Sequence, residues 1–259
     1  MAEKPNFVLV PDPEGTGHPA PTVLGRLRGA VASVIAALQY RPAALSAVNP
    51  AMLTGAAVPG RPRLVFGFDA TASRERAWAT ARQVTDALVQ ALPGELDVAL
   101  AVHGGSRLHT FTEFTADPNT LRDRAAAISC IAGRTQLLPI LSRSLASPGV
   151  RVVTYIGDVY EESPARGRKL ADELGLRGIK LFVLHDTADW TARRDAELFL
   201  DLARRTGGCV LPFDASAPGR LRELLAAIAV YAVGGAKLLR DKHGELPGAV
   251  ILLQHLDPK

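Results

Sequence analysis

Short apolar runs alternate with longer amphipathic stretches from residue 61 onward. A short, continuously apolar run is typical of a strand that is buried on both faces of a sheet. Such runs predict six strands, over residues 64–68, 96–102, 107–112, 150–156, 179–184 and 209–213. The longer stretches repeat every 3.6 residues, and together with cap residues they predict helices over residues 73–92, 136–145, 189–205 and 218–233, and others that begin at Asp117-Pro118 and Ser163-Pro164.

The order of these segments predicts how the strands pair. Gly104-Gly105 separates two strands by a tight turn, so this pair should be an antiparallel hairpin. The later strands are separated by helices, which favours parallel crossovers. We therefore predict an α/β fold: a doubly wound, mostly parallel six-stranded sheet with one antiparallel hairpin strand and helices on both faces, similar to a Rossmann fold.

The two ends of the chain differ from this regular part. Residues 1–60 are rich in proline and contain one predicted helix, over residues 22–40, which is too little for an independent core. We expect this extension to lie against the domain of residues 61–235. Residues 236–259 form a basic tail with a short predicted helix over residues 248–256, which we expect to dock back on the domain.

Composition narrows the class of protein. Hydrophobic residues make up 47% and charged residues 22%, as in an ordinary globular protein. The net charge is only +4, and no basic stripe with interleaved aromatics favours nucleic-acid binding. The first stretch contains acidic residues, unlike a signal peptide, and the apolar run over residues 30–38 is too short to span a bilayer. With two distant cysteines besides, we expect a cytoplasmic protein without a membrane segment.

Oxygen-bearing side chains follow two of the predicted strands. Asp69, Thr71 and Ser73 come after the first strand, Asp158 comes after the fourth, and Thr135 precedes a helix between them. Ligands of open α/β sheets bind at the carboxyl ends of the strands, where the strand order reverses. Carboxylates and hydroxyls suit a hard cation such as Mg²⁺ or Mn²⁺, whereas no His or Cys spacing suits zinc.

This set resembles the metal-ion-dependent adhesion site of von Willebrand factor type A (VWA) domains. That family has D-x-S-x-S after its first strand, a Thr in a later loop and an Asp after its fourth strand, which Asp69, Thr71, Ser73, Thr135 and Asp158 match. Thr71 departs from the usual Ser but keeps the hydroxyl. The resemblance covers residues 61–235 and is nearest to bacterial intracellular VWA proteins, which implies a metal-dependent protein-binding module and suggests an AAA-type ATPase complex as partner.

Each residue also has a structural interpretation. Thr71, Ser73 and Thr135 could cap helices, and Asp158 could belong to a turn. Glu161 and Glu162 precede a predicted helix and would meet its dipole. Arg134 reads as an exposed loop residue. We expect Trp78 and Trp190 in the core, and Asp214 and Ser216 as caps of the helix over residues 218–233.

Three functions remain open from the sequence. The first is a binding module that holds an exposed Asp or Glu of a partner through Mg²⁺, without enzymatic activity, because the chain has no phosphate-binding G-x-x-x-x-G-K-[ST] loop and no G-x-G-x-x-G. The second is a phosphoryl-transfer enzyme that uses Asp69 as nucleophile, although Thr71 stands where such enzymes carry a second Asp. The third is a metal-free interaction scaffold.

Overall fold

A computed structural model describes residues 60–91, 94–186 and 190–256 of the chain. The extension predicted over residues 1–60 therefore lies outside the described residues, apart from Gly60. The prediction for Trp190 also lies outside, because its side chain is not described. Six strands are described: β1 (Arg63–Asp69), β2 (Asp97–Gly104), β3 (Arg107–Phe111), β4 (Val150–Gly157), β5 (Lys180–Asp186) and β6 (Cys209–Phe213).

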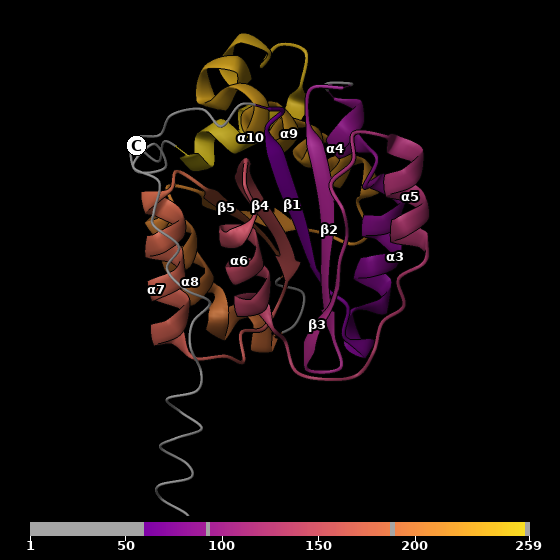
Figure 1. The fold of residues 1–259 in the computed structure, drawn as a ribbon, viewed down its shortest axis with the longest axis vertical. Coiled ribbons are helices and arrows are strands. Elements are labelled where there is room, and N and C mark those ends of the chain that lie inside the picture. The colour runs from indigo at the N-terminus through magenta and orange to yellow at the C-terminus, as the bar shows by residue number, and fades with distance from the viewer. Residues whose placement is uncertain (1–59, 92–93, 187–189, 257–259) are drawn as a thin grey trace, which may run out of the picture. The chain divides into compact units, whose positions relative to one another are not determined.

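The strands form a single sheet in the order β3-β2-β1-β4-β5-β6. β2 and β3 are antiparallel, and every other neighbouring pair is parallel (Figure 1). The predicted fold class is confirmed. From β1 the chain moves outward to β2 and β3 and then crosses back to β4 on the other side of β1. The strand order therefore reverses between β1 and β4, and the carboxyl ends of such strands are where open α/β sheets bind ligands.

Helices lie between the strands along the chain. They are the 3₁₀ helix η1 (Ala72–Arg74) and the α-helices α3 (Glu75–Val84), α4 (Ala87–Gln90), α5 (Pro118–Ala126), α6 (Leu137–Ala146), α7 (Pro164–Leu176), α8 (Trp190–Arg205), α9 (Pro218–Asp241) and α10 (Pro247–Leu256). Asp117 and Ser163 cap α5 and α7, and a proline follows each of them, as predicted. No helix among the described residues is long and apolar enough to cross a membrane.

Three predicted details are wrong. The helix over residues 73–92 is divided into η1, α3 and α4, and the break lies at Thr85 and the buried Asp86, which pairs with arginines of α5 and α9. The hairpin turn is Gly105-Ser106, because these are the two residues with positive φ that such a turn requires. Asp214 and Ser216 do not cap α9, since they bond to each other in a turn and the N-cap is Ala217.

The helix predicted over residues 218–233 also continues further than expected. A kink at Gly235, whose φ is +66°, joins it to a second segment that runs to Asp241. Positive φ is a conformation that glycine adopts at little cost. The predicted end of the helix at Gly234-Gly235 therefore coincides with a change of direction instead of a stop.

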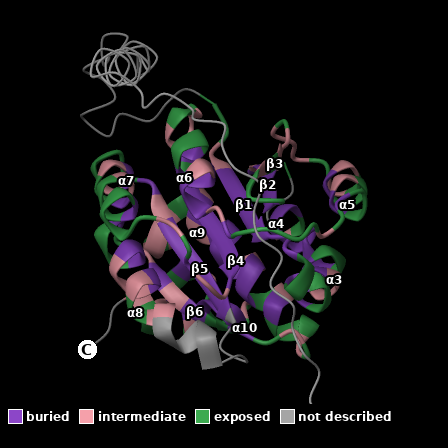
Figure 2. Ribbon diagram, turned by 90° about the horizontal axis from the view of Figure 1, so that it is seen from below, coloured by how far each residue is buried: buried purple, intermediate pink, exposed green. Residues whose placement is uncertain are grey.

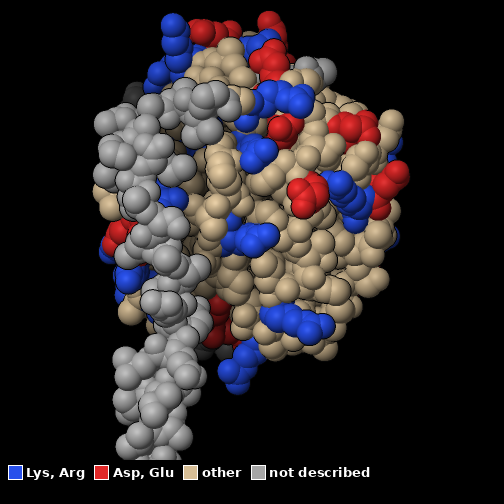
Figure 3. Space-filling model, viewed as in Figure 1, with Lys and Arg blue, Asp and Glu red and all other residues tan. Residues whose placement is uncertain are grey.

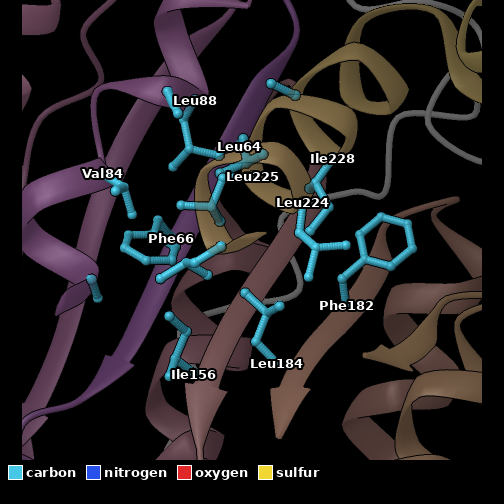
Figure 4. Packing of buried hydrophobic residues seen from close by; sticks show 14 of the residues in the cluster. Leu64, Phe66, Val84, Leu88, Ile156, Phe182, Leu184, Leu224, Leu225 and Ile228 are labelled. Atoms are coloured by element: carbon cyan, nitrogen blue, oxygen red, sulfur yellow. The ribbon is translucent and has the colours of Figure 1, made fainter. Parts of the chain in front are cut away.

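Successive side chains of β1 point to opposite faces of the sheet and contribute to two hydrophobic cores. Leu64, Phe66 and Phe68 point to one face, where helices α3, α4, α9 and α10 supply the packing partners (Figure 4). Val65 points to the other face, toward α6, α7 and α8. The central strands β1, β2 and β4 are buried almost throughout, whereas the edge strand β3 has no buried residue and the outer helix faces are exposed (Figure 2). Trp78 is fully buried in the first core, as predicted.

Charged side chains are distributed over the outside of the molecule. On the face shown in Figure 3, Lys and Arg are interspersed with Asp and Glu, without a continuous basic stripe. This agrees with the small net charge of +4.

The close approach of β5 and β6 makes a prediction about Gly208. A Cβ at this position would overlap the backbone carbonyl of Leu181, whereas a Cβ at Gly219, in the first turn of α9, would meet nothing within 4 Å. We expect Gly208→Ala to lower the free energy of unfolding by about 3 kcal/mol or more. Gly219→Ala should leave it unchanged or raise it by up to about 1 kcal/mol. Urea unfolding of both variants tests this, and equal stabilities would contradict it.

Candidate metal centre

Asp69 is the last residue of β1 and is fully buried. The backbone N–H of Thr71 donates to its Oδ1 atom over 3.0 Å, which turns the chain away from the strand. Its other oxygen, Oδ2, is buried and has no hydrogen-bond partner among the described residues. A buried carboxylate oxygen without a donor costs free energy, so this atom is a natural ligand for a cation.

The hydroxyls of Thr71 and Ser73 lie next to this carboxylate. Their oxygens are 3.3 Å apart, with Thr71 buried and Ser73 exposed. Thr71 is the N-cap residue of η1, but its side chain makes no capping hydrogen bond. The interpretation of Thr71 as a simple helix cap is therefore wrong, and its hydroxyl faces that of Ser73 instead.

Asp158 follows β4 and is linked to the Asp69 loop by an arginine. The Nη1 atom of Arg74 donates to Asp158 Oδ2 over 3.2 Å, and the two side chains are only 7% and 15% exposed. Arg74 directly follows Ser73, so the ion pair draws the ends of β1 and β4 together. A role for Arg74 was not predicted, because a basic residue at a helix start carries no signal of its own.

Thr135 lies in the loop before α6, and this loop is fastened to its neighbours. The N–H of Ile131 donates to the Ala70 carbonyl over 2.8 Å, and the N–H of Arg134 donates to Ser106 Oγ over 2.9 Å. A Cβ at Gly133 would overlap the backbone of the β2–β3 turn. The loop is thus held against both the Asp69 loop and the hairpin.

The side chain of Thr135 pairs with Glu161. The Thr135 N–H donates to Glu161 Oε2 over 2.8 Å, and the Glu161 N–H donates to Thr135 Oγ1 over 3.2 Å. In the described part of the chain, no hydrogen bond joins Thr135 to the other four predicted ligands. The structure thus places Asp69, Thr71, Ser73 and Asp158 in one connected group, and it places Thr135 beside that group through the loop that follows Asp158.

The two glutamates after Asp158 act on a different helix from the one predicted. We expected them at the start of α7, but Glu162 Oε2 accepts the N–H of Leu138 over 2.8 Å, in the first turn of α6. The N-cap residue of α6, Gln136, makes no side-chain cap bond. Carboxylates at a helix start stabilise the unpaired N–H groups there. Glu161 and Glu162 therefore join the Thr135 loop to the end of β4.

A buried polar chain lies behind Asp69. His103 Nε2 is 2.8 Å from Tyr155 Oη, and His103 Nδ1 is 3.7 Å from Asp69 Oδ1. All three side chains are fully buried. Burial lowers the pKa of His103 to about 3, so this ring is neutral. Our prediction missed His103, because the strand was expected to end at residue 102, and it included Tyr155 only as a residue of the strand over residues 150–156.

Burial also raises the pKa of Asp69, from 3.8 to about 6. Hydrogen bonds from Thr71 oppose this shift, the charge of Asp158 adds to it, and the nearby Arg74 reduces it. A cation placed between the two carboxylates would stabilise the ionised form of Asp69. The crevice therefore favours positive charge.

The donor set fits a hard cation better than a soft one. No three His, Cys, Asp or Glu side chains in the described part of the chain could hold a metal together. The carboxylates Asp69 and Asp158 would thus depend on neutral oxygens to complete a shell, and the adjacent hydroxyls of Thr71 and Ser73 are the candidates. Few carboxylates plus neutral oxygens and water is the usual set for Mg²⁺.

Two of the solved structures with a similar fold are named as von Willebrand factor type A domains. The chain resembles a von Willebrand factor type A protein from Catenulispora acidiphila at 17% identity, with 68% of this chain and 43% of that chain covered and a TM-score of 0.53. It resembles the pilus adhesin SpaC from Lactobacillus rhamnosus GG at 10% identity (68% and 31% covered, TM-score 0.53) and the SpRpn10 VWA domain at 10% (62% and 95% covered, TM-score 0.50). No protein-family model and no curated protein matches the chain. The fold is thus VWA-like, and the chain spans less than half of the first two proteins.

The raised pKa of Asp69 predicts how stability depends on pH without metal. The folded protein binds this proton more tightly than the unfolded chain, so stability falls as the pH rises from 3.8 to about 6. In EDTA, Asp69→Asn should raise the free energy of unfolding above pH 6 by at most about 3 kcal/mol, and the gain should shrink below pH 4. Urea unfolding at several pH values measures it.

The matched control is Asp158→Asn, which removes the carboxylate that pairs with Arg74. We expect this variant to be less stable than wild type at neutral pH, because it takes a partner from a buried guanidinium. If both variants, or neither, had a higher free energy of unfolding than wild type above pH 6, the raised pKa of Asp69 would be contradicted.

Proposed function

We propose that this chain is a protein-interaction module that uses Mg²⁺ or Mn²⁺ to hold an acidic side chain of its partner, and that it is not an enzyme. The observation that carries the proposal is the buried Oδ2 atom of Asp69, which has no hydrogen-bond partner among the described residues and lies beside two hydroxyls and a second carboxylate. The VWA-like fold supports an interaction module, since one protein of this fold is a pilus adhesin.

Charge balance supports an acidic partner. Asp69 and Asp158 together offset one divalent cation, and the hydroxyls of Thr71 and Ser73 add no charge. An octahedral shell keeps positions for water, which an Asp or Glu from outside can displace. In a crevice that is partly shielded from water, such a charge-assisted contact is strong. The partner should therefore present an exposed carboxylate, and an AAA-type ATPase complex is one class to examine.

Arg74 favours the metal-free scaffold as the second candidate. Its guanidinium already compensates Asp158, and it lies close enough to Asp69 to lower that pKa. A metal that binds Asp158 has to compete with this ion pair. The enzyme alternative has no such support, because Asp69 is fully buried and a phosphoryl group is bulkier than an ion; turnover of a generic phosphatase substrate would revive it.

Metal titration distinguishes the two candidates. We expect wild-type protein to bind Mn²⁺ in a calorimetric titration and Asp69→Ala to lose this binding. Arg74→Gln should bind about tenfold more tightly, because a charge-assisted bond of about 1.5 kcal/mol no longer competes. Equal heats for wild type and Asp69→Ala would show that Asp69 does not bind the metal. An unchanged affinity in Arg74→Gln would show that Arg74 does not compete with the metal for Asp158.

Partner capture tests the interaction itself. Binding of a partner from a lysate should require Mg²⁺, disappear in EDTA and disappear in Asp158→Ala, while Asp123→Ala, an exposed carboxylate on α5, should bind as wild type does. Circular dichroism confirms that the variants are folded. A partner that binds equally well in EDTA and to Asp158→Ala would favour the metal-free scaffold.

A further inference from the structure

A second concave site lies at the opposite edge of the sheet from the metal centre. It has a volume of about 400 Å³ and is lined by the starts of β4 and β5, by the chain before β1, by the ends of α6 and α7, and by α9 at its kink. Because β1, β4 and β5 are parallel, their starts share the edge that lies away from Asp69 and Asp158. This pocket is therefore separate from the crevice described above.

The floor of the pocket is apolar and its rim is open. Val150, Ile179 and Ala232 are buried there, and the ring of Tyr231 packs edge-on against Phe182. Three glycines with positive φ lie along the rim: Gly149 (+78°), Gly178 (+72°) and Gly235 (+66°). A Cβ would meet no atom within 4 Å at Gly178 and Gly235, so the rim is open at these two positions. The volume lies within the range of about 300–1,000 Å³ that is common for small-molecule sites.

The charge of the lining is one-sided. Among the described residues that line the pocket, four are basic and none is acidic. They are Arg61, Arg151, Arg177 and Lys180. Arg61 pairs with Asp97 outside the pocket, at 3.4 Å. Arg151 and Arg177 make no ion pair with a carboxylate in the described part of the chain.

Both of these arginines are held in place by backbone carbonyls. Arg151 donates from Nη1 to the Val233 carbonyl over 3.0 Å, and Arg177 donates from Nη1 to the Leu145 carbonyl over 2.9 Å. Each bond uses one of the five N–H donors of a guanidinium. The bonds fix two positive charges at the rim. Because these arginine side chains are already ordered, they lose less conformational entropy when a ligand binds.

We propose that this pocket binds a small organic anion with a flat apolar body. The carboxylate, sulfonate or phosphate group pairs with Arg151 and Arg177 at the rim, and the apolar body lies on the floor formed by Val150, Ile179 and Ala232. An anion alone would leave this floor uncovered, and a neutral apolar ligand would make no use of the positive charge that the exposed Arg151 and Arg177 hold at the rim. This site does not depend on the metal centre or on the proposed partner.

Fluorescence titration of the full chain with 8-anilinonaphthalene-1-sulfonate tests the proposal, because this dye is a flat aromatic body with one anionic group. We expect saturable binding of one dye per chain. Arg151→Glu and Arg177→Glu should each weaken it about tenfold or more, since each reverses a charge at the rim. Arg82→Glu, an exposed arginine on α3, should leave the affinity unchanged.

The uncharged analogue N-phenyl-1-naphthylamine separates charge from shape, because it keeps the rings and lacks the sulfonate. Its affinity should be the same in wild type and in both charge-reversal variants. If either of these variants fails to fold, Arg177→Gln keeps a donor for the Leu145 carbonyl and should still weaken sulfonate binding. The absence of saturable dye binding, or equal affinities for wild type and the folded variants at positions 151 and 177, would overturn the proposal.

Discussion

The carboxylate of Asp69 is cut off from water at the end of the central strand, and its neighbourhood is arranged around that charge. Burial raises its pKa to about 6, and the nearby Asp158 adds to the cost of ionising it. The N–H of Thr71 donates a hydrogen bond to one oxygen of Asp69. The Arg74 guanidinium, which pairs with Asp158, lies close enough to lower the pKa of Asp69. The second oxygen, Oδ2, has no hydrogen-bond donor among the described residues. A cation at this point would offset the cost of ionising this buried carboxylate.

The loops around this carboxylate form one connected network. Ile131 joins the Thr135 loop to the Asp69 loop, Arg134 joins it to the hairpin, and Glu161 joins it to the end of β4. Buried backbone groups must find partners, and here each loop supplies partners for the next. These hydrogen bonds therefore hold three loops together around Asp69.

Much of the fold could be predicted from local patterns. The six apolar runs became the six strands, and Asp117-Pro118 and Ser163-Pro164 became helix starts, because burial and capping leave direct traces in a short stretch of sequence. Two of the errors were at Thr85-Asp86 and at Gly235. At the first site the helix breaks beside Asp86, which pairs with arginines of distant helices. At the second the helix changes direction at Gly235 and continues. A helical repeat of apolar residues reveals neither effect.

The sequence by itself determined which oxygen-bearing residues follow β1 and β4. It also determined that they lie at a common end of the sheet, because parallel strands place their carboxyl ends there. Only the tertiary structure decided how these residues are paired. Arg74 contacts Asp158, Glu161 contacts Thr135, and His103 lies between Tyr155 and Asp69. These partners are distant in the chain, and the burial that shifts the pKa values of Asp69 and His103 comes from packing around them. Residue type and spacing record neither a long-range contact nor the exclusion of water, so charge and protonation at this site were decided by the fold.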